Sequence, residues 1–224
     1  MKVFKILNLY ACLGGNRYKW DEVAEIEVTA VELDPELARM YQERFPNDTV
    51  IVADAHQYLL DHYKEFDFVW TSPNCPSHSR SRFWGSSNYN TTTNAVYPDM
   101  SLYAEILLLK HYFKGQYVVE NVIPYYEPLI PAIKRGRHLY WTNFNLPNTL
   151  TERECRISGN RDNPNAKEVK NLCEFHEIDL SSYRGGQRKD KIARNLVDFE
   201  AGRTILETAL NITKQNNTKQ TSLF

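Results

Sequence analysis

The chain has 224 residues, of which 42% are hydrophobic, and its formal net charge is −1. This length and composition are typical of one well-packed domain with a small appendage. The apolar stretches are too short or too interrupted to span a bilayer, and the N-terminus lacks the apolar core and cleavage site of a secretory signal, so a cytoplasmic protein without a membrane segment is expected. The near-neutral charge excludes a strong whole-molecule field for nucleic acid.

Strand-like and helix-like segments alternate along the first half of the chain. Strands are predicted from the apolar runs FKILNLYA, IEVTAVEL, TVIVA, FDFVWTS and QYVVEN. Asp34 and Pro35 are typical of a helix start, and a second helix, capped by Asp99, is predicted over PDMSLYAEILLLKHYF. This order predicts an α/β fold, with a parallel sheet, helices on both faces, and ligands beyond the carboxyl ends of the strands.

The second half of the chain is less regular. We expect residues 1–143 to form the catalytic core and residues 144–186, which lack clear periodicity, to form a short irregular insert. A single helix that returns to the core is predicted over 187–211, followed by a polar tail over 212–224.

Cysteine usage indicates free thiols. Cys12, Cys75, Cys155 and Cys173 are scattered, and no export signal is present, so no disulfide framework is expected. Cys155, Cys173 and His176 are too widely spaced to favour zinc, and no metal is predicted.

The ends of the first three predicted strands carry residues suited to a nucleotide. Gly14 and Gly15 lie in the turn after the first strand, where a backbone can approach a ligand. Glu32 ends the second strand, where related folds bind ribose hydroxyls, and Asp54 follows the third, where it could accept a hydrogen bond from an adenine amino group. Taken alone, each is better explained as a cap or turn residue, but the three in this order favour a nucleotide site.

A cysteine follows the fourth predicted strand. Ser72 and Cys75 both precede proline, which biases them toward extended conformations and stiffens the loop. A thiol held in this way suits a nucleophile, and nearby positive charge from Arg80, Arg82 or Arg137 is expected to help activate it. The alternative is a buried, unreactive cysteine.

The position of Glu120 favours the interpretation of Cys75 as a nucleophile. It ends the fifth predicted strand, and a carboxyl group at the end of a buried strand is costly unless it has a function or a partner. A cysteine and a glutamate are the pair needed to attack a pyrimidine at carbon 6 while hydrogen-bonding or protonating ring nitrogen 3.

Basic residues cluster locally despite the neutral total. They follow Cys75 and crowd a segment after residue 183 with little acid to balance them, as contacts to phosphates would require. The predicted nucleic-acid contacts are Arg80, Arg82, Arg184, Arg188 and Lys189.

Together these segments resemble the DNA (cytosine-5) methyltransferases of a compact prokaryotic or bacteriophage type. YACLGG resembles the family's cofactor motif, VELDPELARMY its ribose segment, ADAHQYL its adenine segment and TSPNCP its nucleophile loop. VVENV, KRGRHLYWTNF and RNLVDFEAGRTIL resemble its later motifs. The resemblance covers residues 4 to about 143 and 190–210, and it implies a Rossmann-like fold that uses S-adenosylmethionine.

The resemblance implies a mechanism and a set of residues. Cys75 adds to carbon 6 of a cytosine flipped out of double-stranded DNA, Glu120 holds nitrogen 3 and the amine, and carbon 5 takes the methyl group, leaving S-adenosylhomocysteine. Arg137 braces the base with Arg135 nearby, and the polar loop 77–94 closes over it. The implied cofactor residues are Tyr10, Ala11, Cys12, Leu13, Gly14, Gly15, Glu32, Leu33, Asp54, Ala55, Pro73 and Asn195.

Three features depart from the family pattern. Cys12 stands in place of the first glycine, which is expected to narrow the methionine end of the cofactor pocket. Asn74 and Pro76 replace the usual neighbours of the nucleophile, and Pro76 removes a backbone donor. The insert is short, so we expect a short or relaxed recognition sequence, with phosphate contacts supplying much of the affinity.

The C-terminus resembles the pentapeptide that docks on the bacterial replication sliding clamp. The preceding polar tail is suited to act as a tether. The predicted clamp contacts are Gln220, Ser222, Leu223 and Phe224.

Several alternatives stay open. The same chemistry could act on RNA, and a non-catalytic module that binds S-adenosylmethionine and DNA would need neither Cys75 nor Glu120. A solitary monomeric modification enzyme fits the tail, and the sequence does not say whether a restriction nuclease accompanies it.

Overall fold

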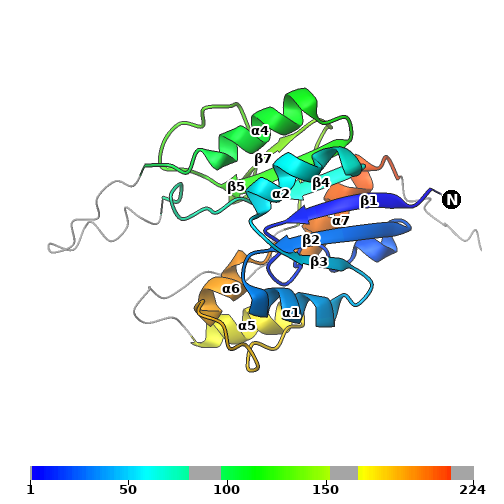
Figure 1. Cartoon of the computed structure of the whole chain (residues 1–224). Helices are drawn as coiled ribbons and strands as arrows, with labels where there is room; N and C mark the ends of the chain where they lie inside the picture. The colour runs from blue at the N-terminus through cyan, green and yellow to red at the C-terminus, as the bar shows by residue number, and fades with distance from the viewer. Residues whose placement is uncertain (1, 81–96, 152–165, 213–224) are drawn as a thin grey trace, which may run out of the picture.

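A seven-stranded sheet forms the centre of the computed structural model, which describes residues 2–80, 97–151 and 166–212 (Figure 1). The strand order is β3-β2-β1-β4-β5-β7-β6. β1 to β5 run parallel, whereas β7 is antiparallel to both of its neighbours. The strands are β1 (Phe4–Leu9), β2 (Ile26–Glu32), β3 (Thr49–Val52), β4 (Phe68–Thr71), β5 (Gln116–Val122), β6 (Ile133–Arg135) and β7 (His138–Thr142). The predicted mixed, mostly parallel sheet is confirmed.

The β6–β7 hairpin was not predicted as strands. Its two-residue turn needs a left-handed conformation, which Gly136 adopts with a φ of 51°, and Arg135 pairs with His138 across it. The strands are short, and the basic residues at the turn hide their alternation.

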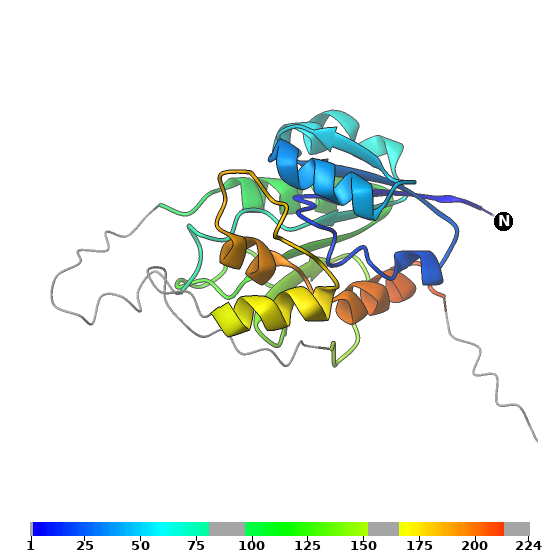
Figure 2. The ribbon, with the colours of Figure 1, turned by 90° about the horizontal axis from the view of Figure 1, so that it is seen from below.

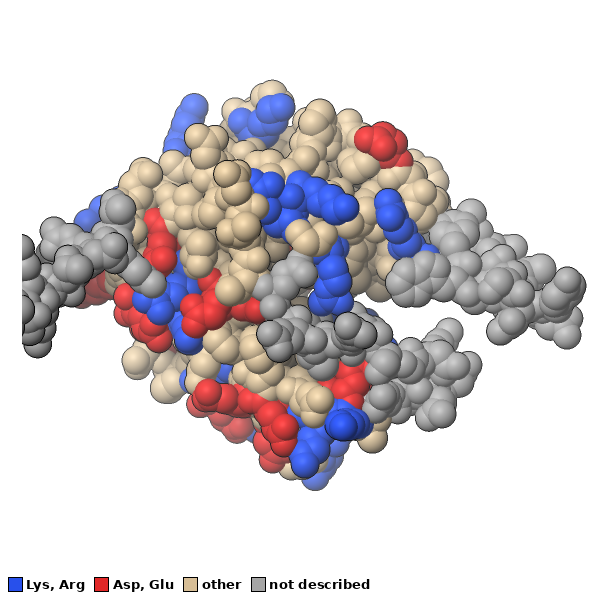
Figure 3. All heavy atoms as spheres, turned by 180° about the vertical axis from the view of Figure 1, so that it is seen from behind, with Lys and Arg blue, Asp and Glu red and all other residues tan. Residues whose placement is uncertain are grey.

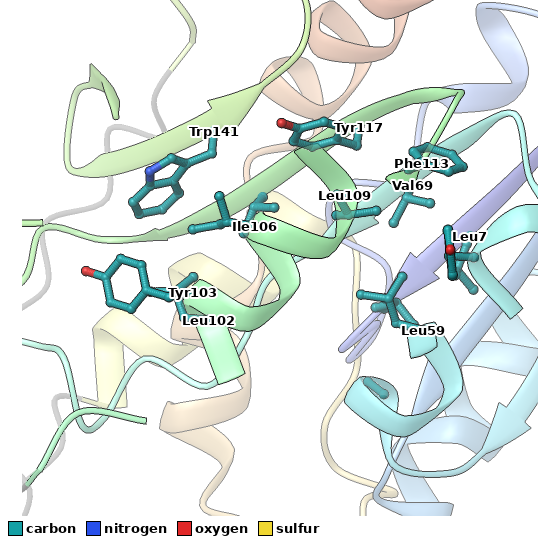
Figure 4. Packing of buried hydrophobic residues seen from close by; sticks show 14 of the residues in the cluster. Leu7, Leu59, Val69, Leu102, Tyr103, Ile106, Leu109, Phe113, Tyr117 and Trp141 are labelled. Carbon is teal, nitrogen blue, oxygen red and sulfur yellow. The ribbon is translucent and has the colours of Figure 1, made fainter. Parts of the chain in front are cut away.

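Helices cover both faces of the sheet. Alternate strand residues point to opposite sides, so Leu7 contacts the α2 (Ala55–His62) and α4 (Ser101–Tyr112) side, while Ile6 contacts the α7 (Phe199–Ala209) side. Figure 4 shows the hydrophobic cluster that contains Leu7, in which Leu102, Tyr103, Ile106 and Leu109 of α4 pack against the sheet. Short 3-10 turns, η1 (Trp20–Glu22) and η2 (Tyr63–Glu65), complete the two layers.

The predicted helix starts are largely confirmed. Asp34 caps α1 (Pro35–Arg44) by accepting hydrogen bonds from the backbone N–H groups of Glu36 and Leu37. The N-cap of α4 is Met100, one residue after the predicted cap Asp99. Asp99 nevertheless accepts a hydrogen bond from the N–H of Ser101 at 3.0 Å.

The predicted irregular insert contains a helix. α5 (Ala166–His176) buries Glu168, Leu172 and His176, which are spaced by four residues on one helical face. α5 packs on α6 (Lys189–Asn195), and both lie beside α1 (Figure 2). Two of the three buried positions are polar, so an apolar pattern could not reveal the helix.

The predicted single helix over 187–211 is wrong, because the chain forms α6 and α7 there. Leu196 leaves α6 in an extended conformation, and Asp198 caps α7 by accepting from the N–H groups of Glu200 and Ala201. The break brings residues 196 and 197 against the loop after β1.

Within the three described ranges, no helix is long and apolar enough to cross a membrane.

Candidate active site

A hydrogen bond connects the loop after β1 to the end of β2. The N–H of Cys12 donates to Glu32 Oε2 at 2.8 Å, and the N–H of Asp34 donates to Glu32 Oε1 at 2.9 Å. Burial raises the pKa of the Glu32 carboxyl, although these backbone donors oppose the rise. Glu32 is thereby held in a fixed direction at the carboxyl ends of the parallel strands.

Positive φ angles recur in this loop. Tyr10 has a φ of 55°, Cys12 of 48° and Gly14 of 66°. Cys12 therefore holds a left-handed conformation that glycine adopts without strain, which gives a structural reason for glycine at this position in the family. Burial, then the neighbouring Glu32 charge, raises the pKa of the Cys12 thiol to about 12, so it is a poor nucleophile at neutral pH.

Gly15 serves the packing of the chain on itself. A Cβ atom at this position would lie 2.6 Å from the Val197 carbonyl oxygen and 3.1 Å from Leu196 Cβ. The backbone that approaches Gly15 is therefore the segment between α6 and α7. The missing side chain of Gly15 thus has a structural role in the protein, and its expected approach to a ligand stays a prediction.

A pocket opens where β1 and β4 end. Of the predicted cofactor residues, it is lined by Tyr10, Ala11, Cys12, Gly15 and Asn195. It also gathers residues that were not predicted: Asn8, Leu9, Asn16, Trp70, Ser72, Leu196 and Val197. The last two come from the break between α6 and α7, whose approach to the first loop the sequence order does not reveal.

The remaining predicted cofactor residues are not among those that line this pocket, and their settings differ. Leu33 is 66% exposed at the tip of β2, whereas Leu13 and Ala55 are buried. Asp54 caps α2 through Oδ1, which accepts from the N–H of Gln57 at 2.8 Å. Pro73 is buried in the loop after β4.

That loop, residues 72–80, is held by the segment that follows β5. The buried Asn121 donates through Nδ2 to the Pro73 carbonyl at 3.0 Å, and the N–H of Tyr125 donates to the His78 carbonyl at 3.1 Å. Ser79 forms a β-bridge with Pro124. The stiffness predicted from the prolines is thus reinforced by contacts from the neighbouring strand.

Cys75 opens a tight turn in this loop. Its carbonyl accepts from the N–H groups of His78 and Ser79, both at 3.0 Å, and Pro76 occupies the second turn position, for which its fixed φ is suited. Pro76 therefore has a local structural role. The Cys75 backbone is committed to the turn, while its side chain stays partly exposed.

Cys75 lies within reach of the charge of Glu120. Burial, then the charge of Glu120, raises the pKa of the Cys75 thiol, and the charge of Lys191 opposes this. The prediction of a thiol activated by Arg80 is wrong for this conformation: the Arg80 Nε donates to the Pro124 carbonyl at 3.0 Å, and the pKa is raised. Lys191, on α6, is the cation that sequence reasoning missed.

Glu120 has a second neighbour that the sequence did not predict. Nε2 of His138 lies 3.5 Å from Glu120 Oε1. Glu120 pairs with Tyr140 across the β5–β7 ladder, so His138, two residues from Tyr140, lies on the same face as a diagonal neighbour. No sequence pattern indicated this pair, because it depends on the register between β5 and β7.

The two predicted arginines lie in the β6–β7 hairpin. Arg137 is exposed in the turn. Arg135 donates through its guanidinium to the carbonyl oxygens of Lys134, Leu146 and Pro147, so it is engaged in holding the backbone that follows β7. Its predicted place at the base is not supported by these contacts.

A buried carboxyl group links three strand ends. Glu105, fully buried on α4, accepts from the Tyr10 hydroxyl and the Thr71 hydroxyl, both at 2.6 Å, and lies 3.0 Å from His56 Nδ1. Tyr10 follows β1, Thr71 ends β4 and His56 begins α2. No sequence pattern predicted this junction beneath the site.

Acidic side chains neutralise more of the positive charge in the segment after residue 183 than predicted. Arg188 and Arg194 pair with Asp190 on α6, and Arg194 also pairs with Glu168 on α5. Lys189 and Arg184 are exposed. Figure 3 shows mainly basic charge in the upper half of the rear face and mixed charge below it.

Several predictions fall outside the described residues and stay predictions. They concern Arg82, most of the loop 77–94, Cys155 and the clamp-like tail Gln220, Ser222, Leu223 and Phe224.

Comparison with known proteins agrees with this arrangement. The family model described as C-5 cytosine-specific DNA methylase matches residues 4–122, more than half of the chain. No curated protein matches the sequence at a significant level.

Solved structures are similar to this chain to different extents, and the first of the three below shares its fold over nearly the whole chain. A methyltransferase from Entamoeba histolytica, EhMeth, is 10% identical, with a TM-score of 0.51 over 94% of this chain and 99% of that one. A DNMT2 variant from Spodoptera frugiperda is 22% identical, with a TM-score of 0.36 over 53% of this chain and 35% of that one. A SAM-dependent methyltransferase from Agrobacterium tumefaciens is 16% identical, with a TM-score of 0.39 over 56% of this chain and 40% of that one. This chain thus spans well under half of the length of the last two.

Proposed function

The chain belongs to the C-5 cytosine-specific DNA methylase family, and on this premise we propose that it methylates carbon 5 of cytosine in double-stranded DNA. The observation that supports this most is that Cys75, in the loop after β4, lies within reach of the charge of Glu120, which stands near the carboxyl end of the adjacent strand β5. A nucleophile and a proton-handling carboxyl group on two adjacent strand ends are what attack on a pyrimidine ring requires.

The residues around the pocket fit S-adenosylmethionine, which supplies an electrophilic methyl group when it is bound. Glu32 is oriented by two backbone donors and keeps acceptor lone pairs for ribose hydroxyls. Leu33 offers exposed apolar surface to an adenine ring, and Asp54 offers a carboxylate to its amino group. Asn195 and the turn Tyr10–Gly15 would surround the methionine end.

The chain's own residues carry the remaining steps. Cys75 forms a bond to carbon 6 of a flipped cytosine, and Glu120 protonates or hydrogen-bonds nitrogen 3, which makes carbon 5 nucleophilic. After methylation a base removes the carbon 5 proton and Cys75 leaves. We assign Arg137 to brace the base and Arg135 to hold the hairpin that carries it.

DNA is the proposed polymer because the matching family is described by it. Exposed Arg80, Arg184 and Lys189 would contact phosphates, and the short segment 144–186 would read few base edges. We propose the core 1–143 as the catalytic unit, with the end of α6 and the break before α7 completing the pocket wall.

Nucleoside mass spectrometry of DNA and RNA from cells that express the protein tests this function. Wild type and Cys173→Ala, a control cysteine on α5, are expected to raise 5-methyldeoxycytidine, whereas Cys75→Ala is expected not to. A rise confined to 5-methylcytidine in RNA would replace DNA by RNA as the substrate. No methylation of either polymer, with binding of S-adenosylmethionine and DNA retained, would favour the binding module.

A further inference from the structure

An imidazole stands beside the proposed proton-handling carboxyl group. His138 Nε2 lies 3.5 Å from Glu120 Oε1, within ion-pair range, and this side chain is 31% exposed while that of Glu120 is 9% exposed. Catalytic hydrogen bonds are often long before substrate binds and tighten in the complex. The pair therefore joins the interior of the site to solvent through an imidazole, a side chain that can both donate and accept a proton.

The position of His138 is fixed by the sheet. It is held between β5 and β6 by its register with Val122 and Arg135. Its ring also contacts Tyr140 edge-on, with centroids 6.4 Å apart and an interplanar angle of 76°. Two strands and an aromatic neighbour thus present the imidazole to Glu120.

Glu120 needs a proton source for the proposed reaction. When the thiolate of Cys75 bonds to carbon 6, the π electrons of the carbon 5–carbon 6 bond move to carbons 4 and 5, and the carbon 4–nitrogen 3 π pair collects on nitrogen 3. Nitrogen 3 then takes a proton from Glu120. A buried carboxyl group has poor access to solvent, so a partly exposed neighbour is needed to restore that proton.

We propose that His138 is the proton donor to Glu120, and thus a positioning and relay residue of the cytosine site. The imidazolium gives its Nε2 proton to Glu120 as Glu120 protonates nitrogen 3, and the neutral imidazole results. When a base other than this pair takes the carbon 5 proton, the carbon 5–carbon 6 π bond reforms, Cys75 leaves as the thiolate, and the nitrogen 3 proton returns by the same route. No oxidant or reductant is consumed. This inference rests on the proposed function.

Other charged and titratable groups surround the pair in the described part of the chain. The thiol of Cys75 faces Glu120 from the loop after β4, and the charge of Lys191 on α6 reaches the same thiol. The hairpin and β7 contribute the remaining groups, Arg135, Arg137 and Tyr140. Lysine and arginine side chains in general stay charged below about pH 9, so a pH-dependent difference in rate between wild type and a His138 variant points to the imidazole.

The test compares wild type with His138→Gln, which retains an amide that can hydrogen-bond but cannot supply a proton. His62→Gln is the matched control, because His62 lies on α2 and is paired with Glu65. The measurement is the rate of covalent adduct formation with a DNA duplex containing 5-fluorocytosine, in the presence of S-adenosylmethionine, from pH 5.5 to 9. We expect a loss on the order of 10- to 100-fold in His138→Gln at pH 6 that shrinks toward none by about pH 9, where a histidine is neutral.

A loss that is the same at every pH would overturn the relay, since it would reflect position alone. An unchanged rate would overturn it as well. If wild type and His62→Gln form no adduct with DNA or RNA, it is the proposed function that fails.

A second measurement then decides the electrostatic coupling without a substrate. Alkylation of Cys75 by iodoacetamide, resolved by peptide mass spectrometry, is expected to slow about two- to fivefold in His138→Gln at pH 6, because a positive charge that offsets Glu120 has been removed. Equal alkylation of the two proteins at every pH would overturn the coupling.

Discussion

Two loops of this protein place a cysteine at the carboxyl end of a parallel strand and beside a carboxyl group from the neighbouring strand. Cys12 follows β1 and lies beside Glu32, whereas Cys75 follows β4 and lies beside Glu120. Burial and the adjacent charge raise the pKa of both thiols, and Lys191 opposes both shifts. The two thiols therefore share their electrostatic surroundings.

The difference lies in what the carboxyl groups are already bonded to. Glu32 accepts backbone N–H groups from both sides, including that of Cys12 itself, so this pair fastens a loop. Glu120 has a titratable side chain as its neighbour, and the Cys75 loop is held through other atoms, chiefly Asn121 on Pro73. The charge around the sulfur therefore does not distinguish the proposed nucleophile from the other cysteine. What distinguishes it is that its neighbouring carboxyl group is not used to hold the loop and is left for a substrate.

Replacing each cysteine gives the largest contrast. Cys75→Ala is expected to lower the methylation rate by at least about 10³-fold, because the covalent step is lost. Cys12→Ala should retain most of the activity, since its thiol takes no part in the chemistry. Methyl transfer from labelled S-adenosylmethionine to DNA measures both, and an inactive Cys12→Ala protein that still folds would remove the distinction between the loops.

Glu120→Gln separates the effect of this carboxyl group on the Cys75 thiol from its role in the reaction. The substitution removes a charge that raises the pKa of the Cys75 thiol, so alkylation of Cys75 at pH 8 should become faster. Methylation should nevertheless fall on the order of 10²-fold or more, because the amide cannot give a proton to nitrogen 3. Parallel losses in both assays would contradict the assigned role.

Gly15→Ala tests the packing of the first loop. The new Cβ would lie 2.6 Å from the Val197 carbonyl oxygen, and overpacking of this kind costs about 1–3 kcal/mol of unfolding free energy. Gly186→Ala is the matched control, since its Cβ would meet nothing within 4 Å. Urea denaturation of the two variants should separate them, and equal midpoints would show that residues 196 and 197 yield easily.

Cys12→Gly should stabilise the protein slightly. A left-handed φ of 48° strains a residue with a Cβ atom by roughly 1–2 kcal/mol, and glycine adopts it freely. The larger backbone entropy of unfolded glycine offsets part of this gain. A small rise in melting temperature is expected, and a clear fall would indicate that the Cys12 side chain contributes packing that outweighs the strain.

The smallest effects concern two histidines near these loops whose pKa values are shifted in opposite directions. A hydrogen bond to Glu105 raises the pKa of His56, so its stabilising contribution is complete below about pH 6.5 and is lost as pH rises through the folded-state pKa. Burial lowers the pKa of His78, so the folded protein favours the neutral imidazole. The protein therefore loses stability as the pH falls below about 6.5.

Stability measured from pH 5 to 8 checks these signs. His56→Gln should weaken the protein most at low pH, whereas His78→Gln should flatten the loss of stability on acidification. Shifts of the same sign in both variants would contradict the two environments.

The sequence predicted the features that depend on local order. The Asp34 cap, the parallel strands and the meeting of Cys75 with Glu120 follow from neighbouring residues and from the rule that parallel strand ends share an edge. The His138–Glu120 pair could not be predicted, because it depends on the β5–β7 register. The contact of Gly15 with Val197 could not be predicted for a similar reason, since Val197 is far along the chain.

Trapping the covalent intermediate tests the central claim most directly. The protein would be incubated with S-adenosylmethionine and a duplex containing 5-fluorocytosine, digested, and the peptide that carries the base identified by mass spectrometry. We predict that the base is attached to the peptide containing Cys75 and is absent in Cys75→Ala. Attachment to the Cys12 peptide, or methylation of ordinary cytosine without any adduct, would contradict the assignment.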